Sequence, residues 1–534
     1  MPKSNKKKKA KSRGGSGAGG GGGGGSGGTA SLSSAAKRPA PTPDAGRALA
    51  AEDQDDGLQF EDAFEDEFEE EMLVEPGDGG AGDGDDGAGD EDSGSGGGGR
   101  LFRPGIDVLN DGEELQFDPS AYIMYHALRP EWPSLSFDIL RDELGGNRTR
   151  FPLTMFAVAG TQADQADANK LTVMKFTDLH RLPKDRSGDN EDSEVALNMG
   201  DEEDEDGGDH LDDDPVLEHI DVAHPAGVNR VRACPTKPSL VATFGDDARV
   251  RVFDLSLHAA ALSGTSPRPA WGTTAPVFTF EGHREEGFAV DWSRVVPGQL
   301  ATGDCAGKIH VWQPGEAGSA VRWQVEESGR ADHKGSIEDI QWSPSEASVF
   351  ISCSVDRSLK VWDVREPRRA MVTNANAHDT DINVVSWNPN VAYLLGSGAD
   401  DGSFKIWDLR SFGGGGQKRV DPIANFRWHT QPITSIEWHP TDESVIGVAS
   451  DDDSITLWDM SVEEDVGGEG SNAMADAASS GKASRPTSDV PPQLLFVHQG
   501  QHSVKELHFH PQIPGVVMST AFDGYNIFKP NTNI

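Results

Sequence analysis

The strongest constraint on the fold is a histidine that recurs with fixed neighbours. Each copy is followed 29 residues later by an aromatic residue, and nine residues later by tryptophan in four of five copies. The histidines are His224, His283, His333, His378 and His429, and the aromatic residues are Phe253, Trp312, Trp362, Trp407 and Trp458. Proline stands eleven residues after four of the histidines. Agreement at several positions predicts repeated units that stack side by side.

Within a unit, short alternating strands are separated by turn residues. Val349–Ser354 and Ser358–Trp362, joined at Asp356, read as an antiparallel hairpin. Units of this length that end a strand in Trp-Asp, as at Trp362-Asp363 and Trp407-Asp408, resemble WD40 repeats. A sixth unit closes the chain, and 151–180 hold a degenerate one. The expected fold is therefore all-β, a seven-bladed propeller.

The chain stops soon after the third strand of its last unit, so the fourth strand must come from elsewhere. An open sheet edge would invite aggregation. Pro133–Leu140 is the upstream candidate. It is either the outer strand of blade seven or the inner strand of blade one, and the sequence leaves both readings open.

The recurring histidine and a hairpin aspartate have the residue types of catalytic groups, but five copies at fixed spacing favour a structural role. The WD40 resemblance implies a network in which they join a strand Ser or Thr and the tryptophan. Buried polar groups are paired in this way, because leaving one unpaired costs about 1–3 kcal/mol. The expected aspartates are Asp247, Asp356, Asp401 and Asp452. Blade three carries Ala306 there, which predicts an incomplete network.

No enzymatic signature accompanies the repeats. The chain has no GxxxxGK[ST], GxSxG or HExxH sequence. Its three cysteines are far apart and show no zinc-ligand spacing. No apolar run reaches 18 residues, and no secretory signal precedes the repeats. We therefore expect a non-enzymatic, intracellular binding protein without cofactor or metal and without membrane association.

Charge is concentrated outside the repeats. The stretches 52–92 and 189–214 hold 34 of the 89 acidic residues and neither Lys nor Arg. This predicts a basic protein partner rather than direct nucleic-acid binding. Residues 1–100 have the composition of a disordered tail, basic and then acidic. The lysines between Lys3 and Lys11 resemble a nuclear or nucleolar address.

The expected domain plan follows from these shifts in composition. After the tail, 101–145 supply a helix and a closing strand, and 146–534 form the propeller, with an acidic insert at 184–216 and a low-complexity insert at 462–490. Two acidic segments are candidate client-binding elements. One carries a stripe of Phe60, Phe64 and Phe68. The other is the run Asp201, Glu202, Glu203, Asp204, Glu205 and Asp206. Both could equally be solvated spacers.

The segment Phe117–Leu140 resembles the start of the histone-binding WD40 proteins of the retinoblastoma-binding and chromatin-assembly family. In that family a helix precedes a "WPSL" strand and helps to form a groove for a histone helix. The resemblance extends to "PPQLLF" after the second insert. It implies these groove candidates: Tyr122, Met124, His126, Leu128, Glu131, Trp132, Pro491, Pro492, Leu494 and Leu495. Arg129-Pro130 is an insertion relative to the family.

A basic tip, an acidic block, the "WPSLSFDIL" segment and a "KELHFHPQIPG" ending together resemble the glutamate-rich WD-repeat family of ribosome-assembly factors. That resemblance implies a nucleolar chaperone that escorts a basic large-subunit ribosomal protein. A histone-binding chromatin chaperone is the first alternative. The second is a substrate receptor of a cullin-based ubiquitin ligase, because "WDVR" and "WDLR" place Arg365 and Arg410 in a WDxR pattern.

Overall fold

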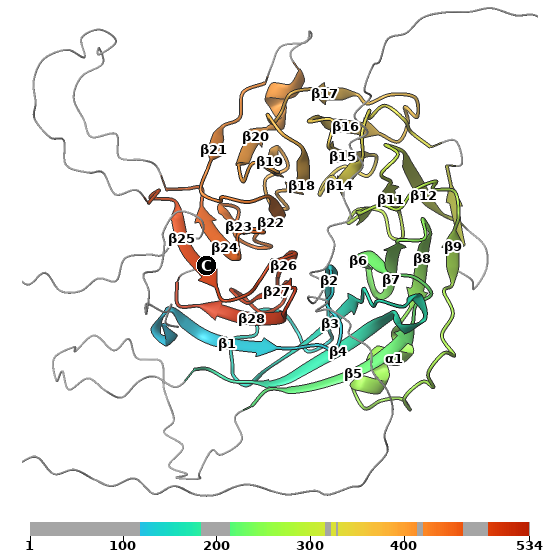
Figure 1. Cartoon of the computed structure of the whole chain (residues 1–534), viewed down its shortest axis with the longest axis vertical. Coiled ribbons are helices and arrows are strands. Elements are labelled where there is room, and N and C mark those ends of the chain that lie inside the picture. The colour runs from blue at the N-terminus through green and yellow to red at the C-terminus, as the bar shows by residue number, and fades with distance from the viewer. Residues whose placement is uncertain are drawn as a thin grey trace, which may run out of the picture. The chain divides into compact units, whose positions relative to one another are not determined.

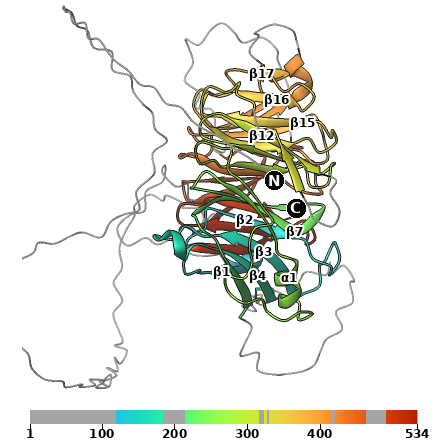
Figure 2. The same cartoon turned by 90° about the vertical axis from the view of Figure 1, so that its right-hand side faces the viewer.

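The computed structural model describes residues 118–182, 214–315, 322–326, 329–413, 420–462 and 490–532. These residues form a β-propeller of seven four-stranded antiparallel sheets arranged in a ring (Figure 1). The turned view shows the blades in a single layer (Figure 2). The seven blades confirm the fold that the spacing of the repeats predicts.

Four blades contain the degenerate unit and the first three histidine units. Blade 1 contains β2 (Ser136–Leu140), β3 (Leu153–Gly160), β4 (Lys170–Leu179) and β5 (Val216–Ala223). Blade 2 contains β6 (Val228–Cys234), β7 (Lys237–Gly245), β8 (Val250–Asp254) and β9 (Phe278–Phe280). Blade 3 contains β10 (Ala289–Trp292), β11 (Leu300–Gly303), β12 (Ile309–Gly315) and β13 (Arg322–Val325). Blade 4 contains β14 (Ile337–Trp342), β15 (Val349–Ser354), β16 (Leu359–Asp363) and β17 (Val372–Asn374).

The remaining blades complete the ring. Blade 5 contains β18 (Ile382–Trp387), β19 (Leu394–Ala399), β20 (Phe404–Asp408) and β21 (Ala424–Phe426). Blade 6 contains β22 (Ile433–Trp438), β23 (Val445–Ser450), β24 (Ser454–Asp459) and β25 (Leu494–Gln499). Blade 7 contains β26 (Glu506–Phe509), β27 (Val517–Ala521), β28 (Gly524–Pro530) and β1 (Tyr122–Leu128). The described helices are short: α1 (Ser256–Leu262), η1 (Pro119–Ala121), η2 (Ala166–Ala168) and η3 (Leu409–Gly413).

The ring closes with two upstream strands instead of one. β1 is the outer strand of blade 7 and pairs antiparallel with β28, with His126 opposite Ile527. β2 then begins blade 1 as its innermost strand. Ser136–Leu140 is therefore the inner strand of blade 1, which resolves the choice that the sequence left open. Figure 1 shows β1 alongside β28.

The helical docking segment is not found among the described residues of 101–145. Tyr122–Leu128 is strand, and the only helical turn there is η1. The reason is that β28 would otherwise leave its outer edge unpaired, and main-chain pairing with β1 satisfies that edge. Met124 has no exposed surface and packs with Phe137 and Ile527 in the core cluster that joins blades 7 and 1. Residues 101–117 lie outside the described part.

The repeating histidine network is complete in blade 4. His333 Nδ1 donates to Asp356 Oδ2 at 3.0 Å, and its Nε2 accepts from Ser352 Oγ at 2.7 Å. Trp362 Nε1 donates to the same Ser352 hydroxyl at 2.8 Å. In blade 6, His429 makes the equivalent contact with Asp452 at 3.0 Å, and Trp458 shares its hydroxyl partner. The structural role expected for these residues agrees with their buried positions.

In blade 5 a serine stands between the histidine and the aspartate of the network. His378 Nε2 contacts Ser397 Oγ at 2.7 Å, and Trp407 Nε1 donates to the same oxygen. On the other ring nitrogen, Ser403 Oγ lies 3.3 Å from His378 Nδ1 and donates to Asp401 Oδ1 at 2.6 Å. The aspartate therefore orients the histidine through a serine.

Two sequence expectations for the network are wrong. In blade 3 the network is complete despite Ala306, because Asp304 accepts from His283 Nδ1 at 2.9 Å. In blade 2, Asp247 does not hold His224, whose Nδ1 donates to the Ala226 carbonyl at 2.7 Å. Asp247 instead accepts two hydrogen bonds from Arg251, a bidentate charged pair that competes with the histidine for the carboxylate.

Candidate functional site

The turns between strands lie on two opposite faces of the ring. We call the face that carries the turns between the second and third strands of each blade, such as the turn at Asp356, the upper face. The face that carries the turns after the inner strands, such as the turn at Arg294, is the lower face.

The groove candidates from both ends of the chain meet where blade 6 adjoins blade 7. The Tyr122 ring on β1 lies 5.2 Å from the Phe496 ring on β25 in an edge-on contact. Tyr122 Oη also lies 2.8 Å from His498 Nδ1. Burial lowers the pKa of His498 to about 3, so this imidazole is neutral. Its Nε2 accepts from the Asn526 amide at 3.0 Å, so Nδ1 carries the hydrogen and donates to the Tyr122 oxygen. We call this contact between β1 and β25 the outer seam.

The groove candidates differ in how far they are available to a partner. Tyr122, Leu128, Leu494 and Leu495 are half-buried, as are His126, Trp132 and Pro491. Pro492 and Glu131 are exposed. Met124 is fully buried and faces the core instead of the surface. Thus β1 and β25 share one side of the ring, while Glu131 and Trp132 lie beyond the end of β1.

Residues 129–135 cross from the outer strand of blade 7 to the inner strand of blade 1. Ser134 Oγ lies 2.6 Å from the Tyr525 hydroxyl, and the Ser134 carbonyl accepts from Thr520 Oγ1 at 2.9 Å. Glu131 accepts from Lys170 Nζ at 3.1 Å. Since Lys170 also binds Asp221 at 3.0 Å, Glu131 helps to fasten this crossing segment to blade 1.

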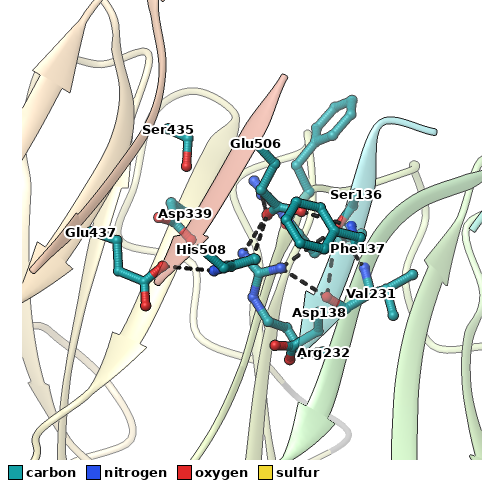
Figure 3. Close-up of polar contacts among 12 residues, drawn as sticks. Ser136, Phe137, Asp138, Val231, Arg232, Asp339, Ser435, Glu437, Glu506 and His508 are labelled. Atoms are coloured by element: carbon teal, nitrogen blue, oxygen red, sulfur yellow. Dashed lines mark hydrogen bonds and ion pairs between the residues drawn. The ribbon is translucent and has the colours of Figure 1, made fainter. Parts of the chain in front are cut away.

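The centre of the ring contains an ion cluster that the sequence reasoning missed (Figure 3). Glu506 on β26 accepts from the Arg230 and Arg232 guanidiniums, each at 2.8 Å. Its second carboxylate oxygen accepts from the backbone N–H of Phe137 at 2.8 Å. Burial alone would raise the pKa of Glu506, but Arg232 and the other cations hold it well below its usual range. Blades 7, 1 and 2 are joined by this one carboxylate.

A histidine extends the cluster toward blade 6. His508 Nδ1 donates to Glu437 Oε2 at 2.7 Å, and its Nε2 lies 3.7 Å from Glu506. Burial alone would lower the pKa of His508, but the two glutamates raise it to about 10. This histidine is therefore a cation at neutral pH, and its role is to bridge two buried carboxylates.

Polar side chains on the inner strands connect each blade to the next. Each inner strand ends near a tryptophan such as Trp342, or near the residue that replaces it in the repeat. The polar side chains stand one or three positions before that residue and face the channel. Most accept a hydrogen bond from a backbone N–H of the following blade. The acceptors and their donors are Asp138 and Ala233, Asp291 and Trp342, Gln341 and Trp387, Ser386 and Trp438, Ser435 and Leu507, and Glu506 and Phe137. Between blades 2 and 3, Arg230 Nε donates to the Phe288 carbonyl at 2.6 Å.

In blades 3, 4 and 6 the sequence signal for this ring of contacts is an Asp, Gln or Glu directly before a buried tryptophan, at Asp291, Gln341 and Glu437. Such residues normally avoid inner strands unless they are paired. The ring of contacts stabilises the inner circle of strands and fixes the position of the two faces of the propeller.

On the upper face, carboxylates of blades 4 and 5 gather near the channel. Glu338 lies on β14, Asp381 just before β18, and Asp400 in the turn between β19 and β20. Burial raises the pKa of Glu338, a hydrogen bond with Ser336 and the charge of Arg230 lower it, and Asp381 and Asp400 raise it. Burial and Asp400 likewise raise the pKa of Asp381, and Arg357 lowers it. The carboxylates therefore repel one another, and cations already lie close enough to act on them.

The two WDxR arginines lie at the lower ends of β16 and β20 in adjacent blades. Arg365 Nε donates to Asp363 Oδ1 at 2.9 Å, and Arg410 Nε donates to Asp408 Oδ1 at 2.9 Å. Both side chains are largely exposed, at 77% and 66%. The Arg410 guanidinium also stacks over the Tyr393 ring at 3.7 Å. Each arginine is thus fixed in direction but open to a partner.

The acidic candidates Phe60, Phe64, Phe68 and Asp201 to Asp206 lie outside the described residues, as do most of both inserts. Within the described ranges, no helix is long and apolar enough to cross a membrane. In the same ranges, no three His, Cys, Asp or Glu side chains are grouped to hold a metal ion.

Two family models match the chain. The model of the histone-binding protein RBBP4 and its counterpart in the CAF1 complex matches residues 112–180. The model "WD domain, G-beta repeat" matches residues 328–363, 370–408 and 420–459. The first model therefore covers β1 to β4, and the second covers blades 4 and 5 and the first three strands of blade 6.

Three curated proteins are similar over most of their length. Protein HEAT STRESS TOLERANT DWD 1 of Arabidopsis thaliana is 44% identical, over 81% of this chain and 91% of its own. Ribosome assembly protein rrb1 of Schizosaccharomyces pombe is 39% identical, over 89% of this chain and 93% of its own. Glutamate-rich WD repeat-containing protein 1 of Dictyostelium discoideum is 44% identical, over 81% of this chain and 85% of its own.

Proposed function

Because the chain belongs to the family of ribosome assembly protein rrb1 and glutamate-rich WD repeat-containing protein 1, we propose that it is a non-enzymatic chaperone of ribosome assembly. Its client is a basic protein of the large ribosomal subunit. Its place of action is the nucleus and nucleolus, in keeping with the basic cluster between Lys3 and Lys11. A member of a WD40 scaffold family acts by binding, so the mechanism is one of capture and release.

The observation that carries the proposal is the group of upper-face carboxylates Glu338, Asp381 and Asp400. Their mutual repulsion has a cost in the empty protein, because Asp381 and Asp400 raise the pKa of Glu338 and Asp400 raises that of Asp381, while Arg230 and Arg357 offset part of the effect. A lysine or arginine side chain placed among them removes that cost. Basic ribosomal proteins carry many such side chains for binding RNA. The same contacts that hold the client therefore cover its RNA-binding surface.

The two acidic stretches 52–92 and 189–214 contribute long-range attraction. Exposed charges attract over about 10 Å at 0.1 M salt, so they raise the rate of encounter with a basic client. The client is handed over when RNA phosphates compete for its cations. Binding by the upper face should weaken with salt, while apolar contacts at the outer seam should not.

The test is charge reversal at the upper face in the full-length protein. We expect Asp381→Lys with Asp400→Lys to weaken capture of a co-expressed basic ribosomal protein about tenfold at physiological salt, because two favourable charge contacts become repulsive. The matched control reverses Asp164 and Asp167, which are exposed acids of a blade 1 loop. Equal capture by both double variants would contradict the proposed role of these carboxylates.

Histone binding is the second candidate function. The match to the histone-binding family model over 112–180 favours it, and so does the outer seam, where half-buried Leu495 belongs to the same apolar cluster as Tyr122 of β1. An amphipathic helix of a core histone would place its apolar face on this seam. Leu495→Asp should then reduce histone capture and spare the ribosomal client. A variant that loses both clients equally would assign them to one shared surface.

A further inference from the structure

The central channel opens on the lower face of the ring, and we call this opening the lower mouth. Two of the seven blades differ there from the repeated sequence of the others. In five blades, the residue one or two positions after the inner strand is a proline. These prolines are Pro235, Pro344, Pro389, Pro440 and Pro511. Blades 1 and 3 have Arg141 and Arg294 in that place. Both arginines line one central cavity of 350 Å³, together with four of the prolines.

Neither guanidinium has a hydrogen bond or ion pair with any residue in the described part of the chain. This distinguishes Arg141 and Arg294 from Arg230 and Arg232, which are bound by Glu506 deeper in the same cavity. Both arginines are exposed to solvent at the rim. Partial burial lowers the pKa of Arg141, the nearby Arg294 lowers it further, and Asp138 raises it. Two like charges are thus held near each other, with ten N–H donors available between them.

Two of the carboxylates that line the cavity, Asp138 and Asp291, are held by backbone N–H groups and form no hydrogen bond or ion pair with either rim arginine in the described part of the chain. Asp138 accepts from the Ala233 N–H at 2.7 Å, and Asp291 accepts from the Trp342 N–H at 2.7 Å. Both therefore serve the contacts between blades. Burial raises the pKa of both acids, to about 7 for Asp291, while Arg232 acts on both in the opposite direction. The rim is left as the positive end of a polar cavity.

We propose that Arg141 and Arg294 form a binding site at the lower mouth for a small, phosphate-bearing solute. A phosphate group offers several acceptor oxygens, and arginine binds phosphate through paired N–H donors. An oxyanion between the two guanidiniums would relieve their mutual repulsion. This site lies on the face opposite to the upper carboxylates, and it does not depend on the proposed client.

The dimensions of the site favour a small solute over a polymer. Small-molecule sites typically occupy about 300–1,000 Å³, and this cavity falls at the lower end of that range. The proline rim is rigid, and the Asp138 and Asp291 carboxylates below it oppose deeper entry by a long polyanion. The ligand should therefore sit at the rim and cover few residues.

Calorimetric titration of the full-length protein with tripolyphosphate tests the site. The basic N-terminus also binds tripolyphosphate, but equally in all variants. The difference in binding between variants therefore measures the contribution of the lower mouth. We expect Arg141→Gln with Arg294→Gln to weaken tripolyphosphate binding at least tenfold. Arg368→Gln, which removes an exposed arginine outside the cavity, should leave binding unchanged. Arg294→Pro is a second variant that restores the residue found in five other blades.

Amide hydrogen exchange locates the ligand in the same samples. Protection by tripolyphosphate should be confined to the turns that follow β2 and β10, and it should disappear in both arginine variants. Unchanged affinity in the double variant would overturn the proposal, as would protection elsewhere only. Tighter binding of poly-glutamate than of tripolyphosphate would reassign the site to an acidic peptide and overturn the choice of phosphate.

Discussion

Replacing Glu506 by glutamine tests whether the central ion cluster holds the closing blade in the ring. Glutamine has the same shape and can still accept from the Phe137 N–H, so the change removes mainly the charge. Arg230, Arg232 and His508 then remain in a buried site with one carboxylate fewer. Breaking a buried ion pair by removing one partner costs about 3–5 kcal/mol. Since domains unfold with about 5–15 kcal/mol, this loss is large.

The dependence on pH follows from the two perturbed groups. His508 has its pKa raised to about 10, so its contribution is complete below the unfolded pKa of about 6.5 and is lost as the pH rises toward 10. Glu506 has its pKa held well below normal, so its contribution is complete above about pH 4.3 and is lost only as the pH falls further. The deficit of Glu506→Gln should therefore be largest near pH 6 and shrink at alkaline pH.

Urea unfolding followed by tryptophan fluorescence at pH 6 and pH 9.5 measures this deficit. The control is Glu437→Gln, which alters the other carboxylate bound to His508 but one whose side chain is 25% exposed. Glu437→Gln should lower the free energy of unfolding clearly less than Glu506→Gln does, because water can solvate the side chain at position 437. A loss below about 1 kcal/mol for Glu506→Gln, or a loss equal to that of the control, would refute the reasoning.

Two further predictions concern the repeat and the lower face. Asp304→Ala should cost about 1–3 kcal/mol in urea unfolding, because it leaves His283 without its carboxylate, whereas Ala306→Asp should be neutral; the opposite order would contradict the assignment of Asp304. If the WDxR pattern docks a cullin-ligase adaptor, Arg365→Ala with Arg410→Ala should abolish co-purification of that adaptor and leave capture of the ribosomal client within twofold. Unchanged recovery of the adaptor would show that the two arginines only stack and pair locally.

The repeat and its register were readable from the sequence because each blade folds mostly through local hairpins. The spacing from His333 to Trp362, for example, places both residues around Ser352 in one blade, and the structure agrees. The predicted strands Val349–Ser354 and Ser358–Trp362 match β15 and β16 to within one residue. Short-range alternation and turn residues suffice for this level of structure.

The errors occurred where contacts over a long sequence separation decide the outcome. The family resemblance implied a helix within 101–145, but in the described part of that segment Tyr122–Leu128 is a strand, because it pairs with the open edge of β28, about 400 residues later. Asp247 has the spacing of a network aspartate, yet Arg251 competes for it. In blade 3 the spacing puts Ala306 at the network position. Asp304, two residues earlier, supplies the carboxylate that His283 Nδ1 contacts instead.

The sequence by itself determined that this chain forms a seven-bladed propeller with acid concentrated outside the blades, because hydrophobic alternation and hairpin turns are local properties. Only the tertiary structure decided how the ring closes, which inner-strand charges pair across blades, and that Arg141 and Arg294 share one cavity. These features depend on which blades become neighbours in space. Main-chain pairing and charge pairing between distant segments have no periodic signal in the sequence, so they appear only when the ring is assembled.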